Sequence, residues 1–306
     1  MIRRRYKVVW FAGALLVGLW FLLFVLSSGR EPTAQGRTLS QWLEALDNPN
    51  AVTNVQTITA LRKMGGKAAV RLVPMLDASD SPLTLRLVNL ARKQGLVQIR
   101  FVPAPVRQRR AERAFEIMGD QAIAAAPALV SLLIRRGTEP AEYLGDSANR
   151  AANALSTLGH GALPFLRPAL CSQQTRVRHE GIRALRSCAN DSASGAITEL
   201  LKLFDDADPR VRQAGAEAMG WSYRQPGLVI PHLARMLGDP NPSVRKQAAY
   251  AIGRFGFQAG NTVGALQQAC SDPTPEVRQA AAAALAKVGG GAAMPRDRSK
   301  PGPKRE

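Results

Sequence analysis

Hydrophobic residues recur at helical spacing through most of the chain, and short polar or glycine-containing segments divide them into pairs of helices. The first helix of a pair ends in a similar short segment at Gly65, Gly119, Gly159, Gly256 and Gly289, as in ALRKMG, AFEIMG and ALSTLG. A glycine after the last helical residue can adopt the left-handed conformation that stops a helix. We therefore expect a helix to end at each of these glycines.

A second apolar helix follows in nearly every unit. These segments end at Leu76, Leu133, Leu170, Phe204 and Leu237. Two such helices joined by a short turn make a helical hairpin, and stacked hairpins make an α-solenoid. The pattern predicts an all-α fold, a right-handed α-solenoid of about seven hairpins over residues 38–288.

The last third of the chain repeats a short motif at a constant interval. Its recurring members are Asp206, Asp239 and Asp272, Pro209, Pro242 and Pro275, and Arg212, Arg245 and Arg278. Proline favours a helix start, because its missing N–H would be unpaired there. Since the aspartates and arginines share one period, we expect them to lie in register and form a structural ladder between repeats, rather than a ligand site.

The residues of this motif resemble a known family. The pattern D-x-x-P-x-V-R-x-x-A-A-x-A-L-G, clearest at residues 206–289, resembles the HEAT repeat family, including its bilin-lyase type. Residues 36–133, which contain GRTLSQWL and DSPLTLRLVNLARKQ, are similar to bacterial membrane-anchored HEAT-repeat proteins of no established activity. The resemblance implies a binding scaffold and supplies no substrate.

The N-terminus carries the one long uncharged segment, Val8 to Leu26. As a helix, this segment is long enough to cross a hydrocarbon core. Arg3, Arg4, Arg5 and Lys7 precede it, so the positive-inside rule places the N-terminus in the cytoplasm. We predict a basic cytoplasmic segment at residues 1–7, a transmembrane helix at 8–26, a linker at 27–37 and an extracytoplasmic solenoid, in the inner membrane of a bacterium.

A cleaved signal peptide is the alternative for the same segment. Its apolar run is longer than a usual signal-peptide core, and residues 26–30 offer no A-x-A cleavage site. These features favour an uncleaved anchor.

The regular spacing fails once, between Gly65 and Gly119, which lie further apart in the sequence than the period of the later repeats allows. We therefore predict an irregular insertion at residues 95–110. Its basic residues are Arg100, Arg107, Arg109 and Arg110. Segments that interrupt repeats often carry function, which makes these arginines candidates for partner binding. The alternative is a solvated basic helix start.

The second helices are rich in basic residues, and in HEAT solenoids such helices usually line the concave face. The bases are Arg71, Arg135, Arg136, Arg167, Lys202 and Arg235, and Glu199 is the acid we place among them. A basic strip would attract an acidic protein segment, an anionic polymer or lipid head groups. Ordinary solubility is the alternative explanation.

Trp42 marks the expected start of the solenoid. Thr38 and Gln41 fit a capping box, and Leu39, Trp42 and Leu43 lie on one helical face. We expect Trp42 to pack in the core of a terminal cap rather than bind a ligand.

The net charge of +18 arises from 41 basic and 23 acidic residues, and it is unevenly distributed. Residues 1–30 carry +5, residues 31–288 carry +10 and residues 289–306 carry +3. The last segment is rich in glycine, proline and charge, which predicts a disordered basic tail. Much of the charge is therefore terminal, which fits an anchored scaffold better than a DNA binder.

Little in the sequence suggests catalysis. The chain has three histidines and three cysteines. His179-Glu180 is an HE pair of the kind that HEAT-repeat di-iron hydroxylases use in several copies, but it occurs here once. We predict no metal site and no cofactor, and we expect the cysteines to be small buried residues.

These observations lead to a membrane-anchored, non-catalytic scaffold that binds a protein with an acidic surface. An alternative is a basic solenoid that binds nucleic acid or another polyanion, as a HEAT-like DNA glycosylase does. A chromophore-lyase subunit, of the bilin-lyase kind, is a weaker alternative. We do not expect a small-molecule substrate, and an exported domain would not meet the chromosome.

Overall fold

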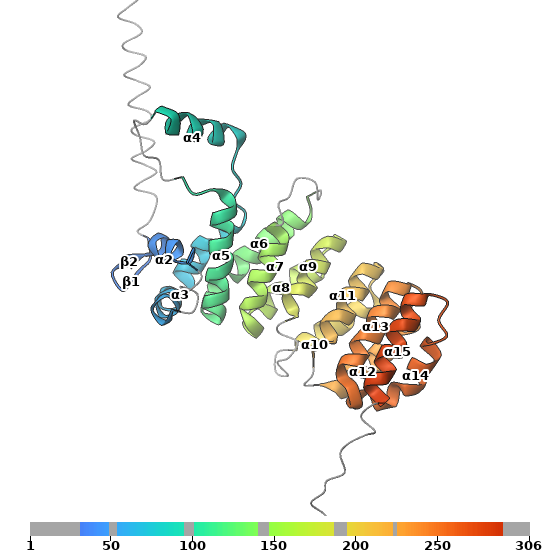
Figure 1. The fold of residues 1–306 in the computed structure, drawn as a ribbon. Coiled ribbons are helices and arrows are strands. Elements are labelled where there is room, and N and C mark those ends of the chain that lie inside the picture. The colour runs from blue at the N-terminus through green and yellow to red at the C-terminus, as the bar shows by residue number, and fades with distance from the viewer. Residues whose placement is uncertain are drawn as a thin grey trace, which may run out of the picture.

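The computed structural model describes residues 31–48, 54–94, 101–139, 147–186, 195–222 and 225–289, and these form an elongated stack of helical hairpins (Figure 1). The first helices are the first half of α3 (Val55–Leu76), α5 (Ala104–Met118), α7 (Ser147–Thr157), α9 (Thr175–Leu185), α11 (Pro209–Met219), α13 (Pro242–Phe255) and α15 (Pro275–Gly289). The second helices are the second half of α3, α6 (Ala126–Gly137), α8 (Leu163–Leu170), α10 (Ala196–Lys202), α12 (Pro226–Met236) and α14 (Val263–Ala269). Within the described residues the predicted solenoid therefore has six complete hairpins and one unpaired final helix.

Each first helix packs against the first helix of the next repeat, from α3 and α5 to α13 and α15. Small residues allow the close approach. A Cβ added to Gly220 would lie 3.1 Å from the Cα of Ala251, and one added to Gly253 would lie 3.1 Å from the Cα of Ala284. Both members of this contact recur in the following repeat, so the small-residue helices predicted from the sequence are what sets the spacing of the repeats.

The predicted glycine stops have the expected positive φ at four of five positions, although with a different backbone geometry. Gly65, Gly119 and Gly256 have φ of 53°, 53° and 54°, but their ψ values are −141°, −128° and −133°. A left-handed helical residue has ψ near +47°. These glycines instead turn the chain directly into the next helical segment. Gly159 also has positive φ, at 68°.

Gly289 is the last residue of α15, as expected, but it lacks the positive φ of a left-handed stop. In the described chain no second helix follows α15, so nothing there requires a sharp reversal.

Short 3-10 segments lead from the first to the second helix in several repeats. They are η2 (Gly119–Ala125), η4 (Gly159–Ala162) and η7 (Gly256–Thr262), while η6 (Leu203–Asp205) extends α10. Their alanines, such as Ala122, Ala125 and Ala259, are fully buried. The turns are therefore part of the core rather than loose connections.

The N-terminal cap contains a feature that the sequence analysis placed in a linker. β1 (Thr33–Ala34) and β2 (Arg37–Thr38) form an antiparallel pair in which Thr33 faces Thr38 and Ala34 faces Arg37. Gln35 and Gly36 both have positive φ, as a tight two-residue hairpin requires. Residues 31–37 are thus folded onto the cap, and the all-α description needs this small correction.

α2 (Leu39–Ala45) completes the cap as predicted. The Thr38 side chain accepts from the backbone N–H of Gln41, and the Gln41 side chain accepts from Thr38, which is a capping box. Trp42 is buried, and its indole N–H donates to the carbonyl of Ala34 at 3.1 Å. The Arg37 guanidinium lies 5.0 Å from the centre of its ring. The hairpin is therefore fixed to the solenoid through Trp42.

The predicted irregular insertion at 95–110 is also corrected. α5 begins at Ala104, so residues 104–110 are regular helix. A proline in its first turn and a carboxylate cap explain the start, since Asp80 accepts from the Ala104 N–H at 2.7 Å. The extra residues between the first two repeats include a separate helix, α4 (Pro82–Gln94), which projects from the stack (Figure 1).

The predicted transmembrane helix at Val8–Leu26 and most of the predicted disordered tail lie outside the described residues. Among the described residues, the helical stretch Ala104–Gly137 is long and apolar enough to cross a membrane. That stretch is α5, η2 and α6, bent at Gly119, and half of its most apolar window is buried inside the solenoid. It therefore forms a core hairpin of the second repeat.

Candidate functional site

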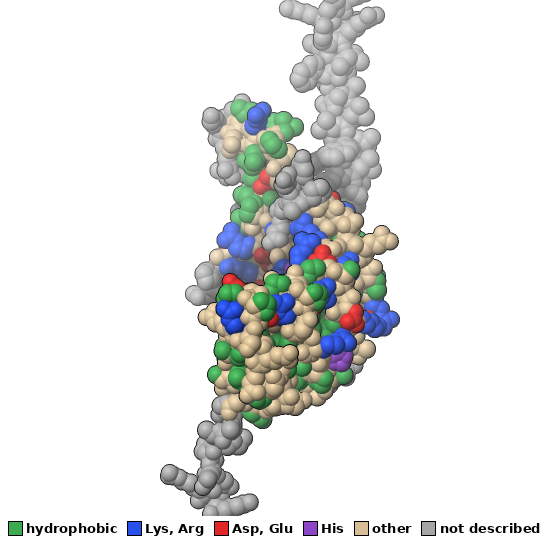
Figure 2. All heavy atoms as spheres, turned by 90° about the vertical axis from the view of Figure 1, so that its right-hand side faces the viewer, with side chains coloured by type: hydrophobic (Ala, Val, Ile, Leu, Met, Phe, Trp, Pro, Cys, Tyr) green, Lys and Arg blue, Asp and Glu red, His purple; other side chains and the backbone are tan. Residues whose placement is uncertain are grey.

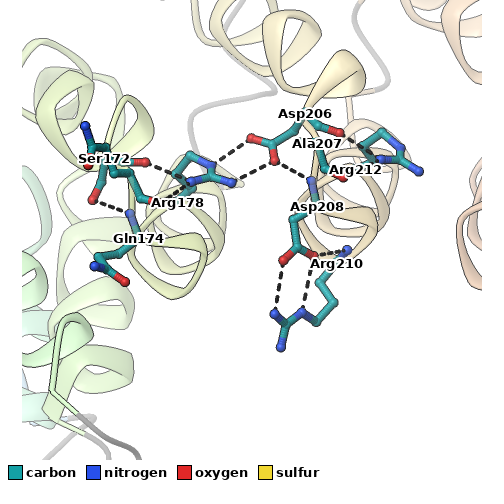
Figure 3. Close-up of polar contacts among 9 residues, drawn as sticks. Ser172, Gln174, Arg178, Asp206, Ala207, Asp208, Arg210 and Arg212 are labelled. Atoms are coloured by element: carbon teal, nitrogen blue, oxygen red, sulfur yellow. Dashed lines mark hydrogen bonds and ion pairs between the residues drawn. The ribbon is translucent and has the colours of Figure 1, made fainter.

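A ladder of arginines and aspartates joins the last four repeats, and Figure 3 shows its first pair, Arg178 and Asp206. Arg178 pairs with Asp206, Arg212 with Asp239 and Arg245 with Asp272, each through Nε at 2.7 Å. In each pair Nη2 donates to the second carboxylate oxygen at 2.8 to 2.9 Å. All three contacts are bidentate, which is the strong geometry for an arginine and a carboxylate.

The same arginines also hold the turn of their own repeat. Nη1 of Arg212 donates to the carbonyls of Asp206 and Ala207 at 2.7 and 3.2 Å. Nη1 of Arg245 donates to Asp239 and Pro240 at 2.9 and 3.1 Å. Each arginine therefore links the corner of its repeat to the corner of the next one.

Arg278 and Arg178 mark the two ends of this ladder. Arg278 donates to the carbonyls of Asp272 and Pro273 at 2.8 and 3.0 Å, and the described chain contains no further repeat beyond it. Arg178 was missed by the sequence analysis. The signal was present, because T-R-V-R ending at Arg178 matches P-R-V-R ending at Arg212, with threonine in place of proline.

Each aspartate accepts hydrogen bonds from the arginine of the preceding repeat and from a backbone N–H of its own turn. Asp239 accepts from the backbone N–H of Asn241 at 2.8 Å, and Asp272 accepts from that of Thr274 at 2.8 Å. The hydrogen bond from Arg245 outweighs desolvation and lowers the pKa of Asp272. For Asp239, burial acts to raise the pKa, but the hydrogen bonds from Arg212 and Asn241 lower it overall. Both carboxylates are thus held ionised in the native state.

The basic side chains of the second helices are accompanied by more acids than the sequence analysis placed there. Arg135 and Arg136 contact Asp77 at 3.1 and 2.8 Å, and Arg136 also contacts Glu139 at 2.7 Å. The hydrogen bonds that Arg136 donates to Asp77, and then to Glu139, raise the pKa of Arg136. Asp77 lies at the C-terminal end of α3, so the two arginines connect the first two repeats.

The same arrangement recurs further along the stack. Arg167 and Lys202 contact Glu199 at 3.3 and 3.1 Å, and Arg235 contacts Asp205 at 3.1 Å. The strip is therefore mixed in charge rather than uniformly basic. Basic and acidic side chains are also interspersed on the side of the molecule drawn in Figure 2. Arg71 is exposed on the second half of α3.

The arginines of the predicted insertion fall into different roles. Arg107 contacts Asp80 at 2.7 Å, and Arg110 contacts Asp47 at 2.6 Å. Arg109 is exposed on α5, and Arg100 lies outside the described residues. Two of the four therefore fasten α5 to neighbouring segments.

A groove runs between the second half of α3 and α6, next to the exposed bases. Its volume is ≈ 590 Å³. Its lining residues are Val73, Pro74, Asp77, Ala128, Ser131, Leu132 and Arg135. A second cleft of ≈ 410 Å³ lies on the other side of Asp77 and is lined by Asp80, Gln108, Arg136 and Arg150 among others. We call the first of these the Asp77 groove. It combines an apolar floor with a basic and an acidic side chain at its rim.

The histidine with a neighbouring glutamate lies on the first-helix side, between α9 and α11. His179 Nδ1 lies 3.4 Å from a carboxylate oxygen of Glu180, which is buried and also contacts Arg183 at 3.2 Å. A cleft of ≈ 260 Å³ beside His179 is lined by Arg186 and Glu217 among others. In the part of the chain that the structure describes, no three His, Cys, Asp or Glu side chains gather as a possible metal site.

The expectation that the cysteines are buried is wrong for Cys171. This residue is the C-cap of α8 and is exposed. Cys270 is partly buried, and Cys188 lies outside the described residues.

The paired helices, the glycine turns and the arginine ladder define the protein as an α-solenoid of helical hairpins. The sequence matches the family of HEAT repeats at residues 145–220 and 230–297. These two stretches of the chain are therefore HEAT repeats. No curated protein matches the chain.

Several solved structures are similar in fold. An engineered protein shares 18% identity over 82% of this chain and 96% of its own, with a TM-score of 0.43. Kap121p bound to Pho4p shares 15% identity over 82% of this chain and 29% of its own, with a TM-score of 0.48. Human deoxyhypusine hydroxylase shares 19% identity over 82% of this chain and 96% of its own, with a TM-score of 0.36.

Proposed function

We propose that the protein is a membrane-anchored HEAT-repeat scaffold that binds an acidic segment of another protein and has no catalytic activity of its own. The observation that carries this proposal is the Asp77 groove. Its apolar floor between two second helices offers burial for a partner side chain, and Arg135 stands at its rim. Apolar contact with a few placed polar groups is the usual form of a binding groove.

At this groove, Arg135 can exchange its ionic contact with Asp77 for one with a partner protein. Arg136 holds Asp77 with two nitrogens, both at 2.8 Å, whereas Arg135 reaches it with one at 3.1 Å. The Arg135 side chain is 64% exposed, so its pair with Asp77 is weak. A carboxylate of the partner protein would form an ion pair with Arg135, while Arg136 would continue to neutralise the charge of Asp77.

The exposed bases further along the second helices extend this surface. The side chains of Arg167, Lys202 and Arg235 are more than half exposed, and each has only a long or exposed ionic contact. They would steer an acidic segment toward the stack and set its orientation. Because acids stand between these bases, the surface suits a segment of mixed polarity better than the continuous phosphates of a nucleic acid.

Membrane anchoring is part of the proposal because of the segment from Val8 to Leu26. Its length, lack of charge and preceding arginines support an anchor with the solenoid on the extracytoplasmic side. A single-pass anchor would hold the groove near the membrane and restrict its partners to that surface.

Site-specific crosslinking tests the partner-binding proposal. A photoreactive benzoylphenylalanine replaces Ser131 in the groove of the full-length protein, expressed in its membrane. We expect a discrete crosslinked protein, and Arg135→Glu with Arg167→Glu should lower its yield about tenfold, because reversed charges repel an acidic partner by about 1–2 kcal/mol.

Lys63 supplies the matched control, since it is exposed on the first half of α3, on the other layer. Lys63→Glu should leave the yield unchanged, and the photoreactive residue at position 63 should not give the same product. Equal crosslinking from both positions, or a product that contains nucleic acid, would contradict the proposal.

A further inference from the structure

The helix α4 has an apolar face that nothing in the described chain covers. Leu83, Leu87 and Leu90 follow one another at helical spacing and lie on one side of it. Their exposed fractions are 67%, 57% and 56%. Val88, on another side, is 8% exposed. The three leucines thus form an exposed apolar stripe, while Leu85, which is 41% exposed, lies on the opposite side of the helix. Hydrophobic side chains are exposed on the projecting helix in Figure 2.

The helix is a formed element of the fold and not a continuation of its neighbours. The Ser81 hydroxyl accepts from the backbone N–H of Thr84 at 3.1 Å, which caps its first turn. Asp80, one residue earlier, holds the start of α5 through Ala104 and Arg107. The base of α4 is therefore tied to the first two repeats, while its body stands away from them (Figure 1).

The charged residues of α4 are all basic, although Asp80 stands directly before its first turn. Arg86, Arg92 and Lys93 belong to α4 itself. A short helix with leucines on one face and only basic charges is the form that lies in the interface of an anionic membrane.

The position of the chain relative to its apolar N-terminal segment makes such contact possible. Leu26 ends that segment, and Glu31 already belongs to the described cap, so the chain between them reaches at most about 18 Å. If Val8–Leu26 spans the bilayer, as the proposed function holds, the N-terminal end of the solenoid stays close to the lipid surface. α4 branches from this same end (Figure 1).

We propose that α4 lies in the interface of the membrane that holds the anchor, with Leu83, Leu87 and Leu90 among the acyl chains and its basic residues at anionic head groups. This inference rests on the membrane anchoring of the proposed function. It gives the solenoid a second attachment point to the membrane, in addition to the N-terminal segment.

Fluorescence quenching by lipids tests this placement in the full-length protein. Leu87→Cys is introduced with Cys171, Cys188 and Cys270 replaced by serine, labelled with the fluorophore NBD, and reconstituted in phosphatidylcholine vesicles that contain phosphatidylglycerol. We expect blue-shifted emission and quenching by nitroxide-bearing lipids about threefold stronger than for Asn89→Cys, the matched control on the polar side of α4.

Arg86→Glu together with Lys93→Glu should reduce the quenching at position 87 in anionic vesicles and have less effect in phosphatidylcholine alone. A blue shift without lipid quenching would place the leucines against a second copy or another protein, and would overturn the proposal. Water-like emission at position 87 would overturn it as well.

Alkaline extraction of the same vesicles separates this inference from the proposed function. Release of the chain by alkali would show that the N-terminal segment is not an anchor. Lipid quenching at position 87 would then still support the interfacial placement of α4. Retention of the chain without quenching would overturn the placement of α4 and leave the proposed membrane anchor intact.

Discussion

Three glycines between paired helices are required for their backbone conformation. Gly65, Gly119 and Gly256 share one conformation, with φ near 53° and ψ between −141° and −128°. An L-residue with a Cβ is strained in this region. The recurring segments such as AIGRFG indicated where helices stop, but the ψ angle depends on how the next helix packs and could not be read from them.

Gly256→Ala should therefore destabilise the protein by about 1–3 kcal/mol, because alanine cannot relax at this φ. Gly260→Ala is the control in the same turn. A Cβ there meets nothing within 4 Å and the φ is not positive, so alanine should be neutral or slightly stabilising. Urea unfolding of the full chain in detergent, followed by circular dichroism, measures both. Equal midpoints for the two variants would contradict this assignment.

The helices are where sequence and structure agree best. The proline starts at Pro209, Pro242 and Pro275 and the second-helix ends at Leu76 and Leu170 are those of the structure. Local chemistry fixes such ends, which makes them predictable. α4 was not predicted because it is not part of a repeated hairpin. Its leucines pack on nothing in the described chain, so the hydrophobic pattern of the repeats does not include it.

The neighbours of the candidate bases could not be predicted either. Asp77 and Asp205 meet Arg135 and Arg235 from a different repeat, through lateral packing of helices that no local pattern encodes. The Arg212 and Asp239 ladder was predictable because its two members recur with one period. Periodic contacts are visible in a single sequence, while contacts made once are not.

Arg245→Lys should lower the free energy of unfolding by about 1–3 kcal/mol, because an ammonium group cannot keep both bonds to Asp272 and the bonds to the carbonyls of its own turn. Arg210→Lys is a matched control, since Arg210 also contacts a carboxylate, that of Asp208, but is 76% exposed and lies within one repeat. That change should have a much smaller effect, because an exposed ion pair contributes little to stability.

Urea midpoints of the same preparation compare the two lysine variants. A loss for Arg210→Lys as large as that for Arg245→Lys would show that the ladder adds nothing beyond a surface ion pair.

The molecule as a whole combines a stack of repeats with a positive net charge to which the two ends of the sequence contribute strongly. Of the net charge of +18, +5 lies in residues 1–30 and +3 in residues 289–306. The rest is spread over a solenoid in which the ladder and the second helices pair bases with acids. We propose that Arg135 at the Asp77 groove, with the other exposed bases of the second helices, contacts a partner protein.

A C-terminal alkaline phosphatase fusion to the full chain should be active, because Arg3 to Lys7 would retain the N-terminus in the cytoplasm and place the solenoid outside. The same fusion with these four basic residues changed to glutamate should lose most of its activity. An inactive phosphatase fusion alongside an active cytoplasmic reporter would contradict this orientation and place the solenoid in the cytoplasm.

The ladder also has a genetic consequence. Arg212 meets Asp239 in the same way that Arg245 meets Asp272, with Nε at 2.7 Å in both, and each member lies one full repeat before its copy. Loss or duplication of one whole repeat by unequal recombination would recreate every pair at the new junction. An insertion of any other length within a repeat would break one of the arginine–aspartate pairs. The gene can therefore lengthen or shorten this arm in whole repeats while the contacts that hold it remain intact.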